Sequence, residues 1–454
     1  MKGEGRATMV LLVLVVWAAG AFTAGAQTAT PSTQPLSLAD AISRAFETSH
    51  RLAEVRARET GARATVRARE AADKPTSVAS ASYTRANHVI PFGFSQPNGT
   101  RFEIYPDIPD NLLTRLSVQW PIYTSGRTDA LEQSALAEAN AAGADLDAAR
   151  ADLKLDVTRV YWALATSIET VRVLEASLGR ADAQLTDARQ RLAVGLIPPS
   201  DVFSFEAQRS REQLQLIEEQ NRRESMMIEL RRLTGERADT VIIPVDPLDG
   251  APRFSASPSA AAASNSIVNE AMDQRPERKA LTFRIGGAQE RERAASTGTK
   301  PAVGFSGGVD YANPNSKIFP RQGEWQTSWD LSVGVTWPVF DGGRTKAEMA
   351  EAAAATSAAR ERLAELDTIV AADVRQRLLD LDSSRAAVQT AQDAVRSAAE
   401  ARRVLGERFA VGVATTTDVL VAQETLLGAE LSRARALASV RFAEARLERA
   451  LGRP

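Results

Sequence analysis

The sequence of 454 residues predicts a mainly α-helical fold with four amphipathic strands, built from two copies of one unit. In each copy a strand pair is expected to lead into a long helical hairpin. Three observations predict this arrangement. A motif recurs after 217 residues, short segments alternate apolar and polar residues, and two very long stretches have the apolar spacing of coiled coils.

The first 26 residues have the features of a secretory signal peptide. Lys2 and Arg6 form a basic start, residues 9–19 (MVLLVLVVWAA) an apolar run, and residues 24–26 (AGA) a small-residue cleavage site. A membrane anchor is the alternative, but the run is shorter than the about 20 residues that a spanning helix needs. No later stretch is as long and apolar, so a mature chain that enters a membrane is not expected to do so as helices.

One motif is written twice. WPIYTSGRTDA begins at Trp120, and WPVFDGGRTKA begins at Trp337. The same offset relates LAVG, ending at Gly195, to FAVG, ending at Gly412. Because separate landmarks keep one register, the chain is predicted to contain a structural duplication. Each motif is interpreted as a strand end, with an interfacial tryptophan, a proline that ends the strand and a glycine-containing turn into a helix.

The duplication divides the mature chain into a first repeat (27–235), a connector or equatorial region (236–275) and a second repeat (276–454). The first repeat is expected to hold a helix, strands at about 77–85 and 112–122, a long helix at about 124–193 and a helix at about 200–233. The second is expected to hold a helix, strands at about 303–311 and 328–339, a long helix at about 342–410 and a helix at about 416–451. The segments near 91–110 and 313–323 are assigned to loops, and 244–266 to an irregular connector, because they are rich in turn-forming or small residues.

The predicted strands have one apolar face and one small or polar face. In the second repeat Trp329, Leu331 and Val333 alternate with Asp330 and Ser332. Such strands suit either a soluble sheet on a core or a transmembrane barrel with lipid outside and water inside. The clustered aromatic residues favour the barrel, and the proposed membrane-interface aromatics are Trp120, Trp329 and Trp337. Four strands cannot close a barrel, since the smallest have about eight, so several chains are expected to share one.

The two long stretches between strand pair and break contain no proline and carry apolar residues at steps of three, four and seven. This spacing predicts coiled-coil helices on the order of 100 Å long. A plain structural coiled coil is the alternative, but it does not explain a membrane-type sheet at one end of the helices.

The helical hairpins are expected to turn at VGLIPPSDV and VGVATTTDV. Gly195 and Gly412 are predicted to end a helix in a left-handed conformation, and Ser200 or Thr417 to cap the next helix. Asp201 and Asp418 would then lie in a first helical turn, where a carboxylate is favourable. The alternative is functional, because an oligomer would gather these aspartates into an acidic ring.

The composition argues against several function classes. The formal charge of −2 gives no general reason to bind nucleic acid, and the chain has no cysteine and only two histidines. No metal site, cofactor or catalytic residue is therefore proposed. The abundant carboxylates follow helix surfaces beside arginines, as solvated faces do, and an enzyme is not expected.

Together the signal peptide, the tandem strand pairs and hairpins, the WPxxxxGRTxA junctions and the VG-containing tips resemble the TolC-like outer membrane efflux proteins. The resemblance implies a homotrimer with a twelve-stranded barrel in the outer membrane and an α-helical tunnel across the periplasm. It implies a passive channel that exports drugs, small molecules or secreted proteins, joined by a periplasmic adaptor to an inner-membrane pump. The adaptor-docking tips would be Val194, Gly195, Leu196, Val411, Gly412 and Val413.

The same resemblance identifies candidates for the periplasmic entrance. Asp418 falls on an aspartate that lines the closed entrance in the best-known member, with Asp201 as its counterpart in the first repeat. A second aspartate of that member is replaced by Val421, and its latching tyrosine and arginine by Phe409 and Ala414. The same closing mechanism is therefore not implied. A periplasmic coiled-coil adaptor or scaffold is the alternative function, and neither the cargo nor the adaptor and pump are indicated.

Overall fold

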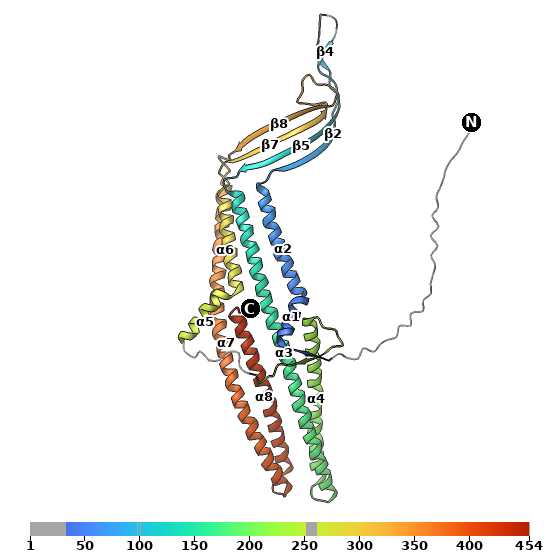
Figure 1. The fold of residues 1–454 in the computed structure, drawn as a ribbon, viewed down its shortest axis with the longest axis vertical. Helices are drawn as coiled ribbons and strands as arrows, with labels where there is room; N and C mark the ends of the chain where they lie inside the picture. The colour runs from blue at the N-terminus through green and yellow to red at the C-terminus, as the bar shows by residue number, and fades with distance from the viewer. Residues whose placement is uncertain (1–32, 98, 100, 251–260, 454) are drawn as a thin grey trace, which may run out of the picture.

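The computed structural model describes residues 33–97, 99, 101–250 and 261–453. The expected signal peptide, residues 1–26, lies outside these residues. The molecule is elongated, with a sheet at one end and two helical tips at the other (Figure 1). Each half of the chain places a strand pair before a long helical hairpin, so the mainly helical, duplicated fold class is confirmed.

The first half contains β1 (Thr33–Leu36), α1 (Leu38–Thr48), α2 (His50–Glu70), the 3₁₀ helix η1 (Ala71–Asp73), β2 (Thr76–Arg85), β3 (Phe92–Ser95), β4 (Arg101–Tyr105), β5 (Asp110–Tyr123), α3 (Arg127–Ala193) and α4 (Pro199–Thr234). The second half contains β6 (Val241–Pro244), α5 (Ala261–Gln274), α6 (Pro276–Ala295), β7 (Ala302–Asn313), β8 (Gln326–Thr336), α7 (Arg344–Ala410) and α8 (Thr416–Ala450). Helices α3 and α7 have 67 residues each, which is about 100 Å at a rise of about 1.5 Å per residue.

The main sheet joins the two repeats. Its strands lie in the order β2-β5-β7-β8, and every neighbouring pair is antiparallel. The repeats meet where β5 pairs with β7, with Leu116 opposite Val309, and Val309 in turn lies opposite Trp329 on β8. Among the described residues no strand pairs with the outer side of β2 or β8. Both edges therefore expose backbone groups that can pair with another chain.

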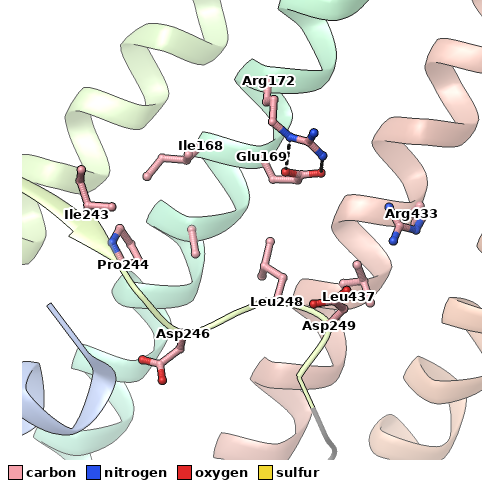
Figure 2. A pocket seen from close by; sticks show the side chains of 11 residues that line it. Ile168, Glu169, Arg172, Ile243, Pro244, Asp246, Leu248, Asp249, Arg433 and Leu437 are labelled. Carbon is pink, nitrogen blue, oxygen red and sulfur yellow. Dashed lines mark hydrogen bonds and ion pairs between the residues drawn. The ribbon is translucent and has the colours of Figure 1, made fainter. Parts of the chain in front are cut away.

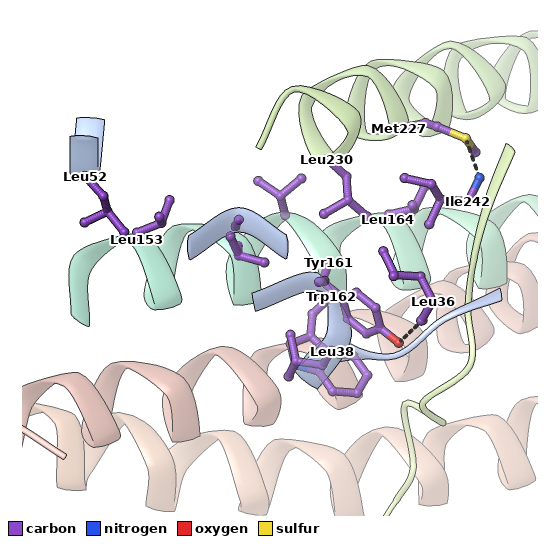
Figure 3. Packing of buried hydrophobic residues seen from close by; sticks show 14 of the residues in the cluster. Leu36, Leu38, Leu52, Leu153, Tyr161, Trp162, Leu164, Met227, Leu230 and Ile242 are labelled. Carbon is purple, nitrogen blue, oxygen red and sulfur yellow. Dashed lines mark hydrogen bonds between the residues drawn. The ribbon is translucent and has the colours of Figure 1, made fainter. Parts of the chain in front are cut away.

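The largest apolar core lies midway along the helices, where the N-terminal segment and the connector cross α3 (Figure 3). Tyr161 and Leu164 on α3, Leu230 on α4, Leu36 on β1 and Ile242 on β6 are almost completely buried. The Tyr161 hydroxyl donates to Asp246 Oδ2 at 2.6 Å, and its oxygen lies 3.1 Å from the Leu36 carbonyl oxygen. This core holds both chain segments against the long helices.

Two small sheets are absent from the strands that the sequence predicts. Strand β6, near the start of the connector, pairs in parallel with β1, and β3 and β4 form an antiparallel hairpin within the expected loop 91–110. These strands have only four or five residues each. They are too short to show a clear alternation, and the segment between β3 and β4 contains the Pro, Asn and Gly typical of loops.

Both prolines of the repeated motif are predicted to end their strands, but only the second of them, Pro338, lies beyond its strand. Strand β5 continues through Pro121 to Tyr123, because a register shift at this point accommodates a residue without an amide hydrogen. Strand β8 ends at Thr336, before the expected end at residue 339, and Pro338 follows outside the ladder. The sheet thus tolerates proline in one copy of the motif and excludes it in the other.

Candidate channel wall and helical tips

One face of the main sheet is apolar and uncovered in the single chain. On β8, Trp329, Leu331, Val333 and Val335 are between 65% and 71% exposed. Val309 on β7 lies opposite Trp329 and continues this face. A contiguous apolar surface of this kind marks a surface that contacts lipid or another molecule. Full burial stabilises a side chain of this size by about 1.5–3 kcal/mol.

The opposite face of the sheet is polar. Ser306 and Ser332 lie side by side on β7 and β8, with their hydroxyl oxygens 2.7 Å apart. Towards the loops, Arg115 on β5 contacts Asp310 on β7 and Asp330 on β8. The sheet therefore has the two-faced character that a wall between lipid and water requires.

The three predicted interface tryptophans lie at both ends of the sheet. The Trp120 indole N–H donates to the Asp73 carbonyl at 2.9 Å, and the Trp337 indole N–H donates to the Thr299 carbonyl at 3.0 Å. Both lie at the helical end and hold the chain just before β2 and just before β7, the first strand of each repeat's pair. Trp329 lies eight residues before Trp337, nearer the loops, which is about 27 Å along an extended chain at about 3.4 Å per residue.

Each tip begins with the same helix ending. Gly195 and Gly412 have φ angles of 76° and 79°, the left-handed conformation predicted for them. The Gly195 N–H donates to the Leu192 carbonyl, and the Leu196 N–H to the Arg191 carbonyl, both at 2.9 Å. This is the pair of hydrogen bonds of a Schellman motif, which satisfies the last carbonyls of a helix. Helix α7 ends in the same way at Gly412.

Apolar side chains project from these turns. Val194, Leu196, Val411 and Val413 are between 70% and 74% exposed. The predicted docking residues therefore lie at two similar tips, which Figure 1 shows at the end of the molecule opposite to the sheet.

Helix α8 begins with a capping box. The Thr415 hydroxyl accepts a hydrogen bond from the Asp418 N–H at 3.2 Å, and Asp418 Oδ2 accepts from the Thr415 N–H at 2.9 Å. The Thr415 hydroxyl also donates to Asp418 Oδ2 at 2.7 Å. This bond, followed by the one from the Thr415 N–H, lowers the pKa of the Asp418 carboxyl. Asp418 is thus a helix-start residue, as one of the two sequence-based interpretations holds.

The prediction that Ser200 and Thr417 cap the second helix of each hairpin is wrong. Thr415 caps α8, and α4 begins at Pro199 with Pro198 in the cap position. The reason is that Pro199 has a fixed φ angle and lacks an amide hydrogen, which suits a first helical position. The α4 start consequently lies one residue before Ser200.

The two tips are joined by a hydrogen bond. The Thr416 hydroxyl, at the start of α8, donates to Asp201 Oδ2, in the first turn of α4, at 2.6 Å. The two aspartates therefore differ in the single chain, because Asp201 bonds to the other hairpin and Asp418 to its own helix. Thr416 has no counterpart that would mark it in the sequence, since the matching position of the first repeat is Pro199.

A second contact between the hairpins involves Phe409. Its ring packs against Phe205 on α4, with ring centroids 6.4 Å apart, and the Arg191 guanidinium lies 5.1 Å from its centroid. Ala414 lies in the turn and donates its N–H to the Arg408 carbonyl, whereas the Val421 side chain is exposed on α8. Among the candidates that replace a latch, Phe409 contacts the other hairpin.

A cavity of about 300 Å³ lies between α3, the connector after β6 and α8 (Figure 2). Its walls combine apolar residues such as Ile168 and Leu248 with charged ones. Arg172 donates to both carboxylate oxygens of Glu169, at 2.6 and 2.8 Å. Asp246, also in the lining, accepts hydrogen bonds from the Tyr161 hydroxyl and the Leu38 N–H. In this lining Glu169 and Arg172 thus pair with each other, and Asp246 holds the connector.

The described residues contain neither a membrane-spanning helix nor a metal-binding cluster. No helix among them combines the length and the apolar character needed to cross a membrane. The same part of the chain has no cluster of three or more His, Cys, Asp or Glu residues placed to hold a metal ion.

A family model described as outer membrane efflux protein matches residues 41–236 and 267–453. The chain belongs to the outer membrane efflux protein family. It is 28% identical over 304 residues to the outer membrane protein TolC of Vibrio cholerae, covering 66% of this chain and 67% of that protein. It is 26% identical over 279 residues to the outer membrane efflux protein BepC of Brucella suis, covering 62% and 58%. The solved outer membrane protein VceC of Vibrio cholerae has the same fold, with a TM-score of 0.75, 21% identity and coverage of 91% and 96%.

Membership places this outer membrane efflux protein in the outer membrane and assigns it to export through a channel. The channel interpretation is therefore favoured over a periplasmic adaptor. The family is one of efflux conduits, which agrees with a two-faced sheet joined to long helices.

Proposed function

We propose that three copies of this protein form one passive export duct, with a twelve-stranded barrel in the outer membrane and a helical tunnel across the periplasm. The observation that carries the proposal is the four-stranded sheet, which has an exposed apolar face, a polar face and two unpaired edges in the described chain. A barrel removes such edges by pairing them. Here β2 of one copy would pair with β8 of the next.

The number of strands supports an assembly. A closed transmembrane barrel needs about eight strands, and this sheet has four. Two copies would give a narrow barrel filled by its own side chains. Three copies give twelve strands and leave room for a water-filled lumen, which agrees with the polar inner face.

The helices extend the same wall away from the membrane. Helices α3 and α7 each follow directly from a strand of the sheet, so three copies would supply six long helices and their six shorter partners. At about 1.5 Å per residue, 67 residues cover about 100 Å. The tips would then lie far from the outer membrane, where a periplasmic adaptor could join them to an inner-membrane pump.

We assign the tips two tasks. The exposed Val194, Leu196, Val411 and Val413, held by the turns at Gly195 and Gly412, are proposed to dock the adaptor, because exposed apolar side chains on rigid turns suit a protein interface. Asp201 and Asp418 are proposed to surround the entrance of the tunnel. The Asp201–Thr416 hydrogen bond and the packing of Arg191 on Phe409 would hold the two hairpins together, in place of the tyrosine and arginine latch of the best-known member.

Substitutions on the two faces of β8 test the proposal. Val333→Arg places a charge on the face assigned to lipid, and Ser332→Arg places the same charge on the face assigned to the lumen. A charged residue facing lipid costs about 2–4 kcal/mol at the bilayer midplane, so Val333→Arg should reduce the amount of trimer in the outer membrane fraction. Ser332→Arg should form trimers and change the single-channel conductance in planar bilayers.

The outcomes that contradict the proposal are equally specific. A wild-type protein that stays monomeric in detergent and conducts no ions would exclude the duct. Equal membrane insertion of the two variants, with unchanged conductance in both, would exclude the assignment of the two faces. Recovery of the wild-type protein in the soluble periplasm would favour the adaptor or scaffold.

A further inference from the structure

The segment between β7 and β8, residues 314–325, lies at the end of the sheet away from the helices (Figure 1). We call it the β7–β8 loop. It is folded onto the polar face of the sheet, where the exposed Lys317 contacts the buried Asp310 and where Asn315 is buried. These contacts are not needed to form the sheet, whose strands already pair along their length.

Lys317 reaches from the loop to the wall. Its ammonium group lies 2.7 Å from Asp310 Oδ2 and also contacts Asp330. Arg115 binds the same two carboxylates, with Nη1 2.8 Å from Asp310 Oδ1 and Nη2 3.1 Å from Asp330 Oδ2. Two cations and two anions thus form a closed, neutral cluster, in which Asp310 is only 5% exposed. Removal of a cation would leave a shielded carboxylate with fewer partners, which is unfavourable.

A glycine makes room for this cluster. A Cβ atom on Gly308 would lie 2.8 to 3.1 Å from three atoms of the Arg115 guanidinium group. The absence of a side chain at Gly308 therefore lets Arg115 lie flat across β7 towards both aspartates. The polar wall is shaped for the cluster, and Lys317 completes it from the loop.

Two further contacts hold the loop in the same position. Asn315 is 2% exposed, and its Nδ2 donates to the Gln326 carbonyl and to Ser328 Oγ, both at 2.9 Å. At the other end Arg321 donates to the Tyr105 hydroxyl at 2.9 Å and to Asn111 Oδ1 at 2.7 Å. The loop is thus fixed to β8 on one side and to the end of β4 and the start of β5 on the other.

We propose that the β7–β8 loop sets the width of the outer mouth of the pore. The ion pairs of Lys317 with Asp310 and Asp330 hold the loop against the inner wall. The inference rests on the proposed function, because only in an assembled barrel does the polar face line a pore. Three copies of the loop then narrow the exit of the pore. Because the cluster that holds each loop is neutral, the narrowing adds no net charge to the pore. The exported cargo must pass between these three loops.

Single-channel recordings of purified trimers test the inference. Lys317→Met with Arg321→Met removes both cationic tethers and keeps unbranched side chains. A second variant replaces residues 316–323 by two glycines and so removes most of the loop. Both should show higher conductance than the wild type and admit larger uncharged polymers into the pore. Lys74→Met, which changes an exposed lysine at the helical end of the sheet, should leave both quantities unchanged.

Two results would overturn the inference while the proposed function stands. Trimers of the shortened variant that conduct and exclude polymers as the wild type does would show that the loop does not narrow the pore. A wider pore in the shortened variant, with wild-type behaviour in the Met variant, would show that the cationic tethers do not hold the loop. If the wild-type protein forms no channel, the proposed function fails and this inference with it.

Discussion

Thr416 donates a hydrogen bond from its hydroxyl to Asp201 Oδ2 at 2.6 Å and thereby joins the tips of the two helical hairpins. The bond links the first turn of α8 to the first turn of α4. Nearby, Phe409 at the end of α7 packs against Phe205 of α4 and beneath Arg191 of α3. The tips of one chain are therefore coupled by a polar and an aromatic contact, and their separation requires both to break.

Removal of the Thr416 hydroxyl should weaken this coupling. Thr416→Val keeps the shape of the side chain and deletes the donor to Asp201. If the tips surround the entrance, the variant should open more often or conduct more in planar bilayers. The control is Ser204→Ala, because the Ser204 hydroxyl donates to the backbone of its own helix, at the Ser200 carbonyl. Currents identical to those of the wild type would show that the Thr416–Asp201 hydrogen bond does not affect opening of the channel.

Neutralisation of the tip aspartates should change how cations act on the channel. Asp418→Asn, alone or with Asp201→Asn, removes carboxylates that three copies would bring together as a ring. We expect the variants to lose part of any block by divalent cations, measured as conductance over a range of cation concentrations. Unchanged dose–response curves would leave both aspartates as helix-start residues only.

Acid should remove the stabilising effect of Asp418 on the start of α8. Hydrogen bonds from Thr415 lower the pKa of this carboxyl in the folded protein. Its contribution is therefore complete above the ordinary aspartate pKa of about 3.9 and is lost as the pH falls through the lower folded-state value. Limited proteolysis of the tip should cut Asp418→Asn faster than the wild type at neutral pH and equally fast at strongly acidic pH. A difference that persists in acid would contradict this account.

The left-handed residue of each tip should resist substitution. An alanine at Gly195 has no neighbouring atoms within 4 Å to clash with, so its cost comes from the φ angle of 76° alone. We expect Gly195→Ala to destabilise the tip by about 1–2 kcal/mol. Gly179, in the interior of α3, also has free space around it, and Gly179→Ala should stabilise the helix by up to about 1 kcal/mol. Hydrogen exchange at the tip and along α3 should show changes of opposite sign.

The equatorial core should depend on the Tyr161 hydroxyl. It donates to Asp246 Oδ2 at 2.6 Å, and burial raises the pKa of this phenol. Tyr161→Phe should lower the thermal stability of the assembly, since loss of a buried hydrogen bond to a charged partner costs about 1.5–3 kcal/mol. Tyr123→Phe, at an exposed tyrosine of β5, should have little effect. Equal melting temperatures for the two variants would contradict a fastening role for Tyr161.

The features visible in the sequence are those with a long period. Strict alternation in Trp329–Val335 and the uninterrupted coiled-coil spacing of α3 and α7 predict their elements, because each signal extends over many residues. The helix ends at Gly195 and Gly412 were predictable from the local sequence alone, because glycine is favoured in the left-handed conformation that ends a helix. Their duplication at a constant offset strengthens every one of these assignments.

The features that escape the sequence depend on partners far apart in the chain. Strands β1 and β6 pair although Leu36 and Pro244 are separated by most of the first repeat. The contacts of Thr416 with Asp201 and of Lys317 with Asp310 are set by the packing of whole elements. No local pattern marks Thr416 as a donor or Lys317 as the residue that completes a charge cluster.

Native mass spectrometry of the wild-type protein released from detergent micelles tests the central claim most directly, because it counts the chains in one assembly. We expect a single species of three chains, which supplies twelve strands from sheets of four. A species of one or two chains, under conditions in which the protein conducts ions, would contradict it.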